Sequence, residues 1–246
     1  MQVTTNKRLI NTRTRLGSLA NVVAIVLLIG GLLINLQGQG VEYMWVTYAM
    51  LIGAVVLQMV AKASTMRFGA RPRIDEALNH NLKTLDHKHH LYHYVPGVPV
   101  DHLLVSPNGL FVIEARPNLG KFRVVGEKWR REGGLSRWLL AFGEGGVGNM
   151  PRELKSRVGA TRTFLNEQLG EDLSSTIPVE GIVVFTHPST KIETENPTVT
   201  VVHARDLRPE VKRREGRARL SQDALRRVNQ ALNEQAAADS LVPAKA

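Results

Sequence analysis

Ser18–Leu36 reads SLANVVAIVLLIGGLLINL, and Tyr43–Ala61 reads YMWVTYAMLIGAVVLQMVA. Neither run contains a charged residue, and each has about the 20 residues that a helix needs to cross a bilayer. Because hydrocarbon offers the backbone no hydrogen-bond partners, such segments are expected to be helical. The sequence therefore predicts a hairpin of two transmembrane helices joined by an external loop over residues 37–42.

Basic residues flank this hairpin on both sides, whereas the loop between the two runs has no Lys or Arg. Because Lys and Arg are retained on the cytoplasmic side, both termini and the rest of the chain are expected to be cytoplasmic, at the cell membrane. A cleaved signal peptide is the alternative for the first run, although no small-residue cleavage site follows it. The flanking residues are Lys7, Arg8, Arg13 and Arg15 before the first run, and Lys62, Arg67, Arg71 and Arg73 after the second.

The composition is that of one domain attached to this hairpin. The chain has 246 residues, and the part after the hairpin is long enough to bury a core. The absence of cysteine excludes disulfides, thiolate zinc sites and cysteine nucleophiles. The net charge of +10 suits nucleic acid or anionic lipid as a partner. The expected division is a basic N-terminus (1–17), the spans (18–36 and 43–61), a linker (62–73), the domain (74–238) and a disordered tail (239–246).

The hydropathy pattern of the domain predicts alternating helices and strands. Leu78, Leu82 and Leu85 have helical spacing within residues 74–86, and Val179–Thr186 is apolar throughout most of its length, as in a buried strand. This order of elements predicts an α/β domain with a mixed central sheet flanked by helices. Further helices are expected over 151–169, 204–211 and 221–238, and further strands over 89–95, 98–105, 110–115, 121–125 and 198–203.

A tight turn at Ser106–Gly109 is expected to bring two carboxylates together. Pro at its second position and Gly at its fourth favour a type I turn. Asp101 and Glu114 lie equally far from this turn, so they would face each other across the two strands. Facing carboxylates destabilise a sheet unless a cation lies between them, and Mg²⁺ prefers carboxylate and phosphate oxygens. The alternative places both carboxylates at strand ends, in water.

The stretch Val100–Arg116 reads VDHLLVSPNGLFVIEAR and resembles the core of the nuclease-related domain (NERD) family. That family has an Asp, an apolar strand, a Gly turn, a Phe-Val-Ile run and then Glu-x-Lys. Weaker similarities extend the resemblance over residues 74–232. They comprise Gly120, Gly126 and Trp129, the helix Asn149–Leu169 and the strand Glu180–Thr186.

This resemblance implies a restriction-endonuclease-like core with a PD-(D/E)xK-type site. Asp101 and Glu114 would bind Mg²⁺ or Mn²⁺, and Arg116 would take the place of the Lys. Asp75 on the first helix of the domain, or alternatively Glu76, would complete the site. Metal-assisted hydrolysis of nucleic-acid phosphodiesters would follow, in DNA processing or in defence against foreign DNA. Four basic residues downstream would track the nucleic-acid backbone, unless they only form a solvated strand edge: Lys121, Arg123, Lys128 and Arg130.

Two departures from the family pattern favour loss of activity. Arg116 stays protonated, so it stabilises phosphate but cannot act as a general base. The family's helix often carries Gln three residues after its Pro, where this chain has Leu154 beside Glu153. The sequence therefore leaves two main alternatives open. One is a membrane-anchored metal-dependent nuclease, and the other is an inactive nuclease-fold module that binds nucleic acid or a protein at the membrane.

Overall fold

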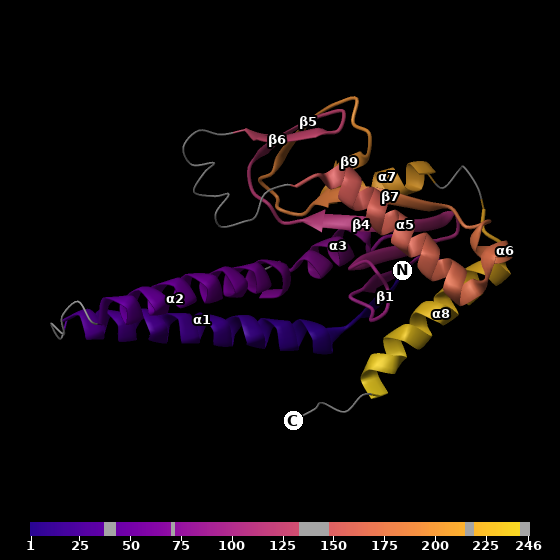
Figure 1. Cartoon of the computed structure of the whole chain (residues 1–246). Helices are drawn as coiled ribbons and strands as arrows, with labels where there is room; N and C mark the ends of the chain where they lie inside the picture. Colours follow the sequence, from indigo (N-terminus) through magenta and orange to yellow (C-terminus); the bar gives the residue numbers. More distant parts are fainter. Residues whose placement is uncertain (37–42, 70–71, 133–147, 215–218, 242–246) are drawn as a thin grey trace. The chain divides into compact units, whose positions relative to one another are not determined.

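The computed structural model describes residues 1–36, 43–69, 72–132, 148–214 and 219–241 (Figure 1). The expected external loop and the last residues of the expected tail lie outside these ranges. The chain forms two compact units. The helical unit lies within Lys7–Arg73, and the globular unit combines Met1–Asn6 with the described residues from Ile74 onward.

The helical unit confirms the two predicted helices. It consists of α1 (Lys7–Leu36), α2 (Met44–Ser64) and one π-helical turn, η2 (Thr65–Gly69). Both α1 and α2 are long and apolar enough to cross a membrane, judged by length and composition. Most of their large apolar side chains are exposed, as lipid-facing side chains would be.

Small residues form the contact between α1 and α2, which run side by side in Figure 1. Gly17 lies against Ser64, whereas Gly31 lies against Thr47, so the two helices are antiparallel. The Ser64 hydroxyl also donates a hydrogen bond to the Arg13 carbonyl oxygen at 2.7 Å. Glycine at a helix contact lets the two backbones approach closely, as is common between membrane helices.

The globular unit is built on a six-stranded mixed sheet with the order β1-β2-β3-β4-β7-β9. Strands β2, β3 and β4 are antiparallel, whereas β1 is parallel to β2, and β4, β7 and β9 are parallel to one another. This arrangement confirms the predicted fold class. The strands are β1 (Gln2–Thr5), β2 (His90–His93), β3 (His102–Ser106), β4 (Gly109–Arg116), β7 (Val179–Phe185) and β9 (Thr200–His203).

Helices pack on both faces of this sheet, and each face has its own core. On one face, Leu154 and Leu165 of α5 meet Val112 and Val183 of the sheet. On the other face, the core contains residues of α3 and α7, together with alternate residues of the same strands, such as Ile113. The helices are α3 (Ile74–Leu82), α5 (Met150–Leu169), α6 (Glu171–Ser174), the short 3₁₀ helix η3 (Ala204–Asp206), α7 (Leu207–Arg214) and α8 (Gln222–Leu241).

Local sequence explains where the two long helices of the globular unit begin. The Asn149 side chain accepts a hydrogen bond from the Arg152 backbone N–H at 3.2 Å, and Pro151 occupies the first turn of α5, where its missing N–H has no cost. The Ser221 hydroxyl accepts from the Ala224 N–H at 3.1 Å and caps α8, as its position predicted.

A second sheet was only partly predicted. It has the order β6-β5-β8 and consists of β5 (Lys121–Val125), β6 (Lys128–Glu132) and β8 (Lys191–Glu195). Only β5 was expected as a strand. The sequences KWRRE and KIETE consist mostly of charged residues, and Lys and Glu are uncommon in strands, so neither has a strong strand pattern.

The N-terminal strand β1 is an unpredicted part of the main sheet. Gln2 N–H donates to the His89 carbonyl at 2.9 Å, and Asn6 N–H donates to the His93 carbonyl at 3.1 Å. The Thr4 hydroxyl also lies 2.8 Å from His90 Nε2. The first six residues therefore belong to the globular unit, and the basic flank from Lys7 is already helical.

We expect Gly181→Ala to destabilise the globular unit and Gly159→Ala to stabilise it. A methyl group on Gly181 would lie only 2.6–2.8 Å from side-chain atoms of Leu154, so α5 would have to move away from β7 at a cost of about 1–3 kcal/mol. A methyl group on Gly159 meets nothing within 4 Å, and Ala raises helix propensity by about 0.5–1 kcal/mol. Chemical denaturation of the full chain in detergent measures both changes. Equal effects of the two substitutions would contradict the close α5–β7 approach.

We expect Thr4→Pro to destabilise the globular unit more than Val3→Pro. Since Gln2 and Asn6 donate to β2, the Thr4 N–H faces β2 and the Val3 N–H faces away. Proline at Thr4 removes this donor and the hydroxyl contact with His90, at a cost of about 2 kcal/mol. The same unfolding measurement tests the pair. Indistinguishable free energies of unfolding would show that β1 contributes little to the sheet.

Candidate active site

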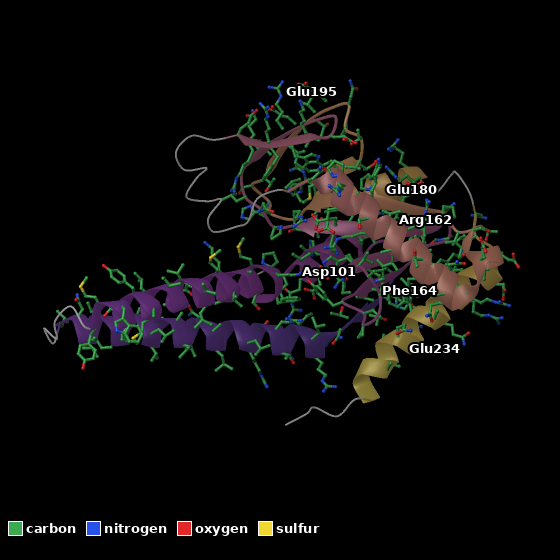
Figure 2. All side chains as sticks on the ribbon, viewed as in Figure 1. Asp101, Arg162, Phe164, Glu180, Glu195 and Glu234 are labelled. Atoms are coloured by element: carbon green, nitrogen blue, oxygen red, sulfur yellow. The ribbon has the colours of Figure 1, made fainter. Side chains whose placement is uncertain are left out.

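The β3–β4 hairpin has the register that the turn predicted. Leu103 faces Val112, and Ser106 faces Gly109. Asp101 precedes β3 by one residue, and continuing the register by two residues from Leu103 places it opposite Glu114 (Figure 2 labels Asp101). The negative charge of Asp101 raises the pKa of Glu114, so the two carboxylates interact. The sequence-predicted pair therefore lies at one end of this hairpin.

Both oxygens of Glu114 form ion pairs with arginines. Glu114 Oε1 lies 3.1 Å from Nη2 of Arg116, and Oε2 lies 2.9 Å from Nε of Arg157. Glu153 bridges the same two guanidinium groups, at 2.8 Å from Arg116 and 3.4 Å from Arg157. We call Glu114, Arg116, Glu153 and Arg157 the arginine–glutamate cluster.

The cluster forms because two elements each present a pair of residues to the other. Side chains alternate along β4, so Glu114 and Arg116 share the face of Val112, which packs in the same core as α5. Glu153 and Arg157 are four residues apart on α5, so they lie on one face of the helix. Figure 1 shows α5 lying across β4 and β7.

Burial dominates the electrostatics of Glu114, which is only 8% exposed. This burial raises the pKa of the carboxyl above its ordinary value of 4.5. The charges of Arg116 and Arg157 lower this pKa, whereas those of Glu153 and Asp101 raise it further. Glu114 is thus a desolvated carboxylate held between two cations and two anions.

The donors, as they are arranged, do not fit a divalent cation. Mg²⁺ at Glu114 would meet two guanidinium groups that already occupy both carboxylate oxygens, and Arg157 would have to leave. Among the residues that the structure describes, no group of three or more His, Asp or Glu side chains is suited to hold a metal. The assignment of Mg²⁺ or Mn²⁺ to Asp101 and Glu114 stays a prediction.

Asp75 and Glu76 lie in the first turn of α3. Asp75 is buried and Glu76 is exposed. The apolar residues of α3 pack in the core on the opposite face of the sheet from the cluster. Helix α3, which carries Asp75, therefore packs on the opposite face of the sheet from the cluster. The catalytic role of Asp75 also stays a prediction.

The four basic residues expected to contact nucleic acid lie on the outer face of the second sheet, but two of them are ion-paired. Lys121 Nζ lies 2.9 Å from Glu132 and 2.8 Å from Glu193. Arg123 Nη2 lies 2.6 Å from Glu195, which Figure 2 labels on this sheet. Lys128 and Arg130 of β6 are exposed on the same face. The acidic residues of the unpredicted β8 thus offset part of the expected basic surface.

Sequence reasoning missed Arg157 and noted Glu153 only as the neighbour of Leu154. The Glu-x₃-Arg spacing from Glu153 to Arg157 is typical of a helical ion pair, and this spacing was the available signal. It could not show that both side chains reach Glu114, because that contact depends on how α5 packs on β4.

We expect the stability of the wild-type chain relative to Glu114→Gln to fall as pH rises. Because the pKa of Glu114 is raised by folding, the folded state binds this proton more tightly than the unfolded state does. The resulting stabilisation is fully present below the ordinary value of 4.5 and is lost as pH rises through the raised pKa. Denaturation of both full-length proteins in detergent, from pH 4 upward, measures the difference. A relative stability that rises instead would mean that the arginines lower this pKa overall.

Comparison with known proteins agrees with the architecture of the globular unit. Residues 71–186 match the family described as Nuclease-related domain (NERD). This match includes α3, the β3–β4 hairpin with Asp101 and Glu114, the second-sheet strands β5 and β6, helix α5 and strand β7. No curated protein and no solved structure matches the chain. The extent of the family match supports the resemblance seen at Val100–Arg116, and residues 71–186 are therefore similar to the nuclease-related domain (NERD) family.

Proposed function

We propose that this protein is a membrane-anchored nuclease-fold module that binds nucleic acid through phosphate contacts without cleaving it. The observation that carries this proposal is the pairing of both Glu114 oxygens with Arg116 and Arg157. A carboxylate used in this way is not available to a catalytic metal. The fold of a nuclease-related domain is thereby kept while the chemistry of its centre is changed.

Two features support contact with phosphate groups. Lys128 and Arg130 are exposed on the outer face of the second sheet, where they can approach a nucleic-acid backbone. Nε of Arg116 is buried and has no hydrogen-bond partner within the described part of the chain. A buried guanidinium N–H without a partner is costly, and a phosphate oxygen would satisfy it if a local movement exposed this N–H.

The arrangement of the chain supports a location at the cytoplasmic face of the membrane. Strand β1 precedes α1, and strand β2 follows α2, yet the two strands pair in one sheet. Two membrane crossings, by α1 and α2, would return the chain to the side on which it started, as the pairing of β1 with β2 requires. The basic flanks of both helices favour the cytoplasm as that side.

Metal-dependent phosphodiester hydrolysis is the second candidate function. The confirmed hairpin register favours it, because this register places Asp101 opposite Glu114 at the end of β3. If Arg157 withdrew, these two carboxylates would hold Mg²⁺ or Mn²⁺, which supplies Lewis-acid activation of water and phosphate when bound. Arg116 would then stabilise negative charge on the phosphate.

A binding and cleavage assay on the full chain separates the two candidates. The chain is placed in nanodiscs of zwitterionic lipid, and fluorescent single- and double-stranded DNA and RNA are titrated at several salt concentrations with EDTA. We expect salt-sensitive binding, and we expect Lys128→Glu with Arg130→Glu to weaken it at least about tenfold and to reduce the salt slope by about 2. The matched control reverses the charges of Arg226 and Arg227 on α8 by substitution with Glu, and we expect it to weaken nucleic-acid binding less.

Cleavage is then measured with Mg²⁺ or Mn²⁺ in place of EDTA. Intact substrate supports the binding module. Cleavage that EDTA, Asp101→Asn and Glu114→Gln each abolish would establish the second candidate in its place. Absence of both binding and cleavage with every substrate would overturn both functions. Equal losses of binding in the two charge-reversed pairs would remove the binding role from the second sheet.

A further inference from the structure

Arg157 of α5 occupies one of the two carboxylate oxygens of Glu114. Its Nε lies 2.9 Å from Glu114 Oε2, the oxygen that Arg116 does not contact. Its Nη2 also contacts Glu153 at 3.4 Å, within one turn of the same helix. The Arg157 guanidinium is thus fixed by two carboxylates, and its side chain is only 26% exposed.

We infer that the guanidinium group of Arg157 replaces the divalent cation in this nuclease-related centre. Charge supports this assignment. The arginine–glutamate cluster contains two cations and two anions, so it is neutral without a metal. A divalent ion held by Asp101 and Glu114 would likewise compensate the charge of Glu114. Burying the charge of Glu114 without compensation would be costly, so this carboxylate requires either the arginines or a divalent ion beside it.

The replacement has a direct consequence for metal affinity. A divalent ion at Glu114 would have to displace Arg157 and would still meet the charge of Arg116. Replacing Arg157 with Gln leaves the cluster with a net negative charge and releases Oε2 of Glu114. We therefore expect this one substitution on α5 to open a cation site at Asp101 and Glu114, with Arg116 still on the other oxygen of Glu114.

Mn²⁺ binding tests this inference without any nucleic acid and without an activity measurement. The full chain in zwitterionic nanodiscs is titrated with Mn²⁺, and the electron paramagnetic resonance signal of free aqueous Mn²⁺ reports the bound fraction. We expect no stoichiometric site in the wild-type chain. We expect Arg157→Gln to bind one Mn²⁺ per chain, with an affinity at least about tenfold above that of the wild-type chain for Mn²⁺. We expect the double variant Arg157→Gln with Glu114→Gln to lose this Mn²⁺ site.

Arg162→Gln is the matched control, because Arg162 is on the same helix but donates to the Val179 carbonyl, at 3.4 Å (Figure 2). We expect it to behave as the wild type does, and Arg157→Lys, which keeps a positive charge, to gain no site. Thermal unfolding is the second readout, because a metal that binds only the folded state raises the melting temperature. We expect Mn²⁺ to raise that temperature for Arg157→Gln more than for Arg162→Gln.

Two results would overturn the inference. One is stoichiometric binding of one Mn²⁺ by the wild-type chain that the Asp101→Asn substitution abolishes. This result does not depend on the folding of any Arg157 variant. The other is Arg157→Gln with neither an added Mn²⁺ site nor an added thermal shift. The inference rests on the proposed non-catalytic centre. Its failure is distinguishable from a failure of nucleic-acid binding, because that binding is measured in EDTA and is tested with substitutions on the second sheet.

Discussion

The two-residue turn between β3 and β4 fixes the positions of Asp101, Glu114 and Arg116 in the candidate site. Because Ser106 pairs with Gly109, the strands that follow have only one register. That register places Asp101 near Glu114 and, by alternation, turns Glu114 and Arg116 toward α5. A shift of one residue would move Glu114 to the opposite core, among the apolar residues of α3 and α7.

The ion pairs of the arginine–glutamate cluster join this hairpin to α5. Buried ion pairs offer little net stability, because desolvation of the charges offsets their attraction. Removing one partner is nevertheless costly, since it leaves another charge buried. The cluster therefore adds little net stability, although each of its charges depends on the others. Close packing of Leu154 against Gly181 brings α5 to the sheet, where Glu153 and Arg157 meet the charged residues of β4.

The sequence predicted the parts of this protein that local patterns encode. Both membrane-type helices, the mixed sheet, the hairpin register and the beginnings of α5 and α8 follow from apolar runs, turn residues and caps. Strands β1, β6 and β8 were missed because they are short or highly charged. Strand β6 pairs with its neighbour β5, whereas the partners of β1 and β8 are also distant in sequence. Arg157 was missed for the same reason, because helix packing alone brings it to Glu114. Metal binding and nucleic-acid contact remain predictions.

Strand β1 also constrains the order in which the molecule folds. Gln2 is synthesised before the two helices of the hairpin, whereas its partner His90 follows only after both helices have been made. Closing so long a loop is slow for a flexible chain, whereas two helices packed antiparallel bring its ends back together. Assembly of the helical hairpin would therefore precede completion of the sheet edge. A chain whose first helix fails to insert would keep an open edge at β2, which cellular quality control can recognise as exposed backbone.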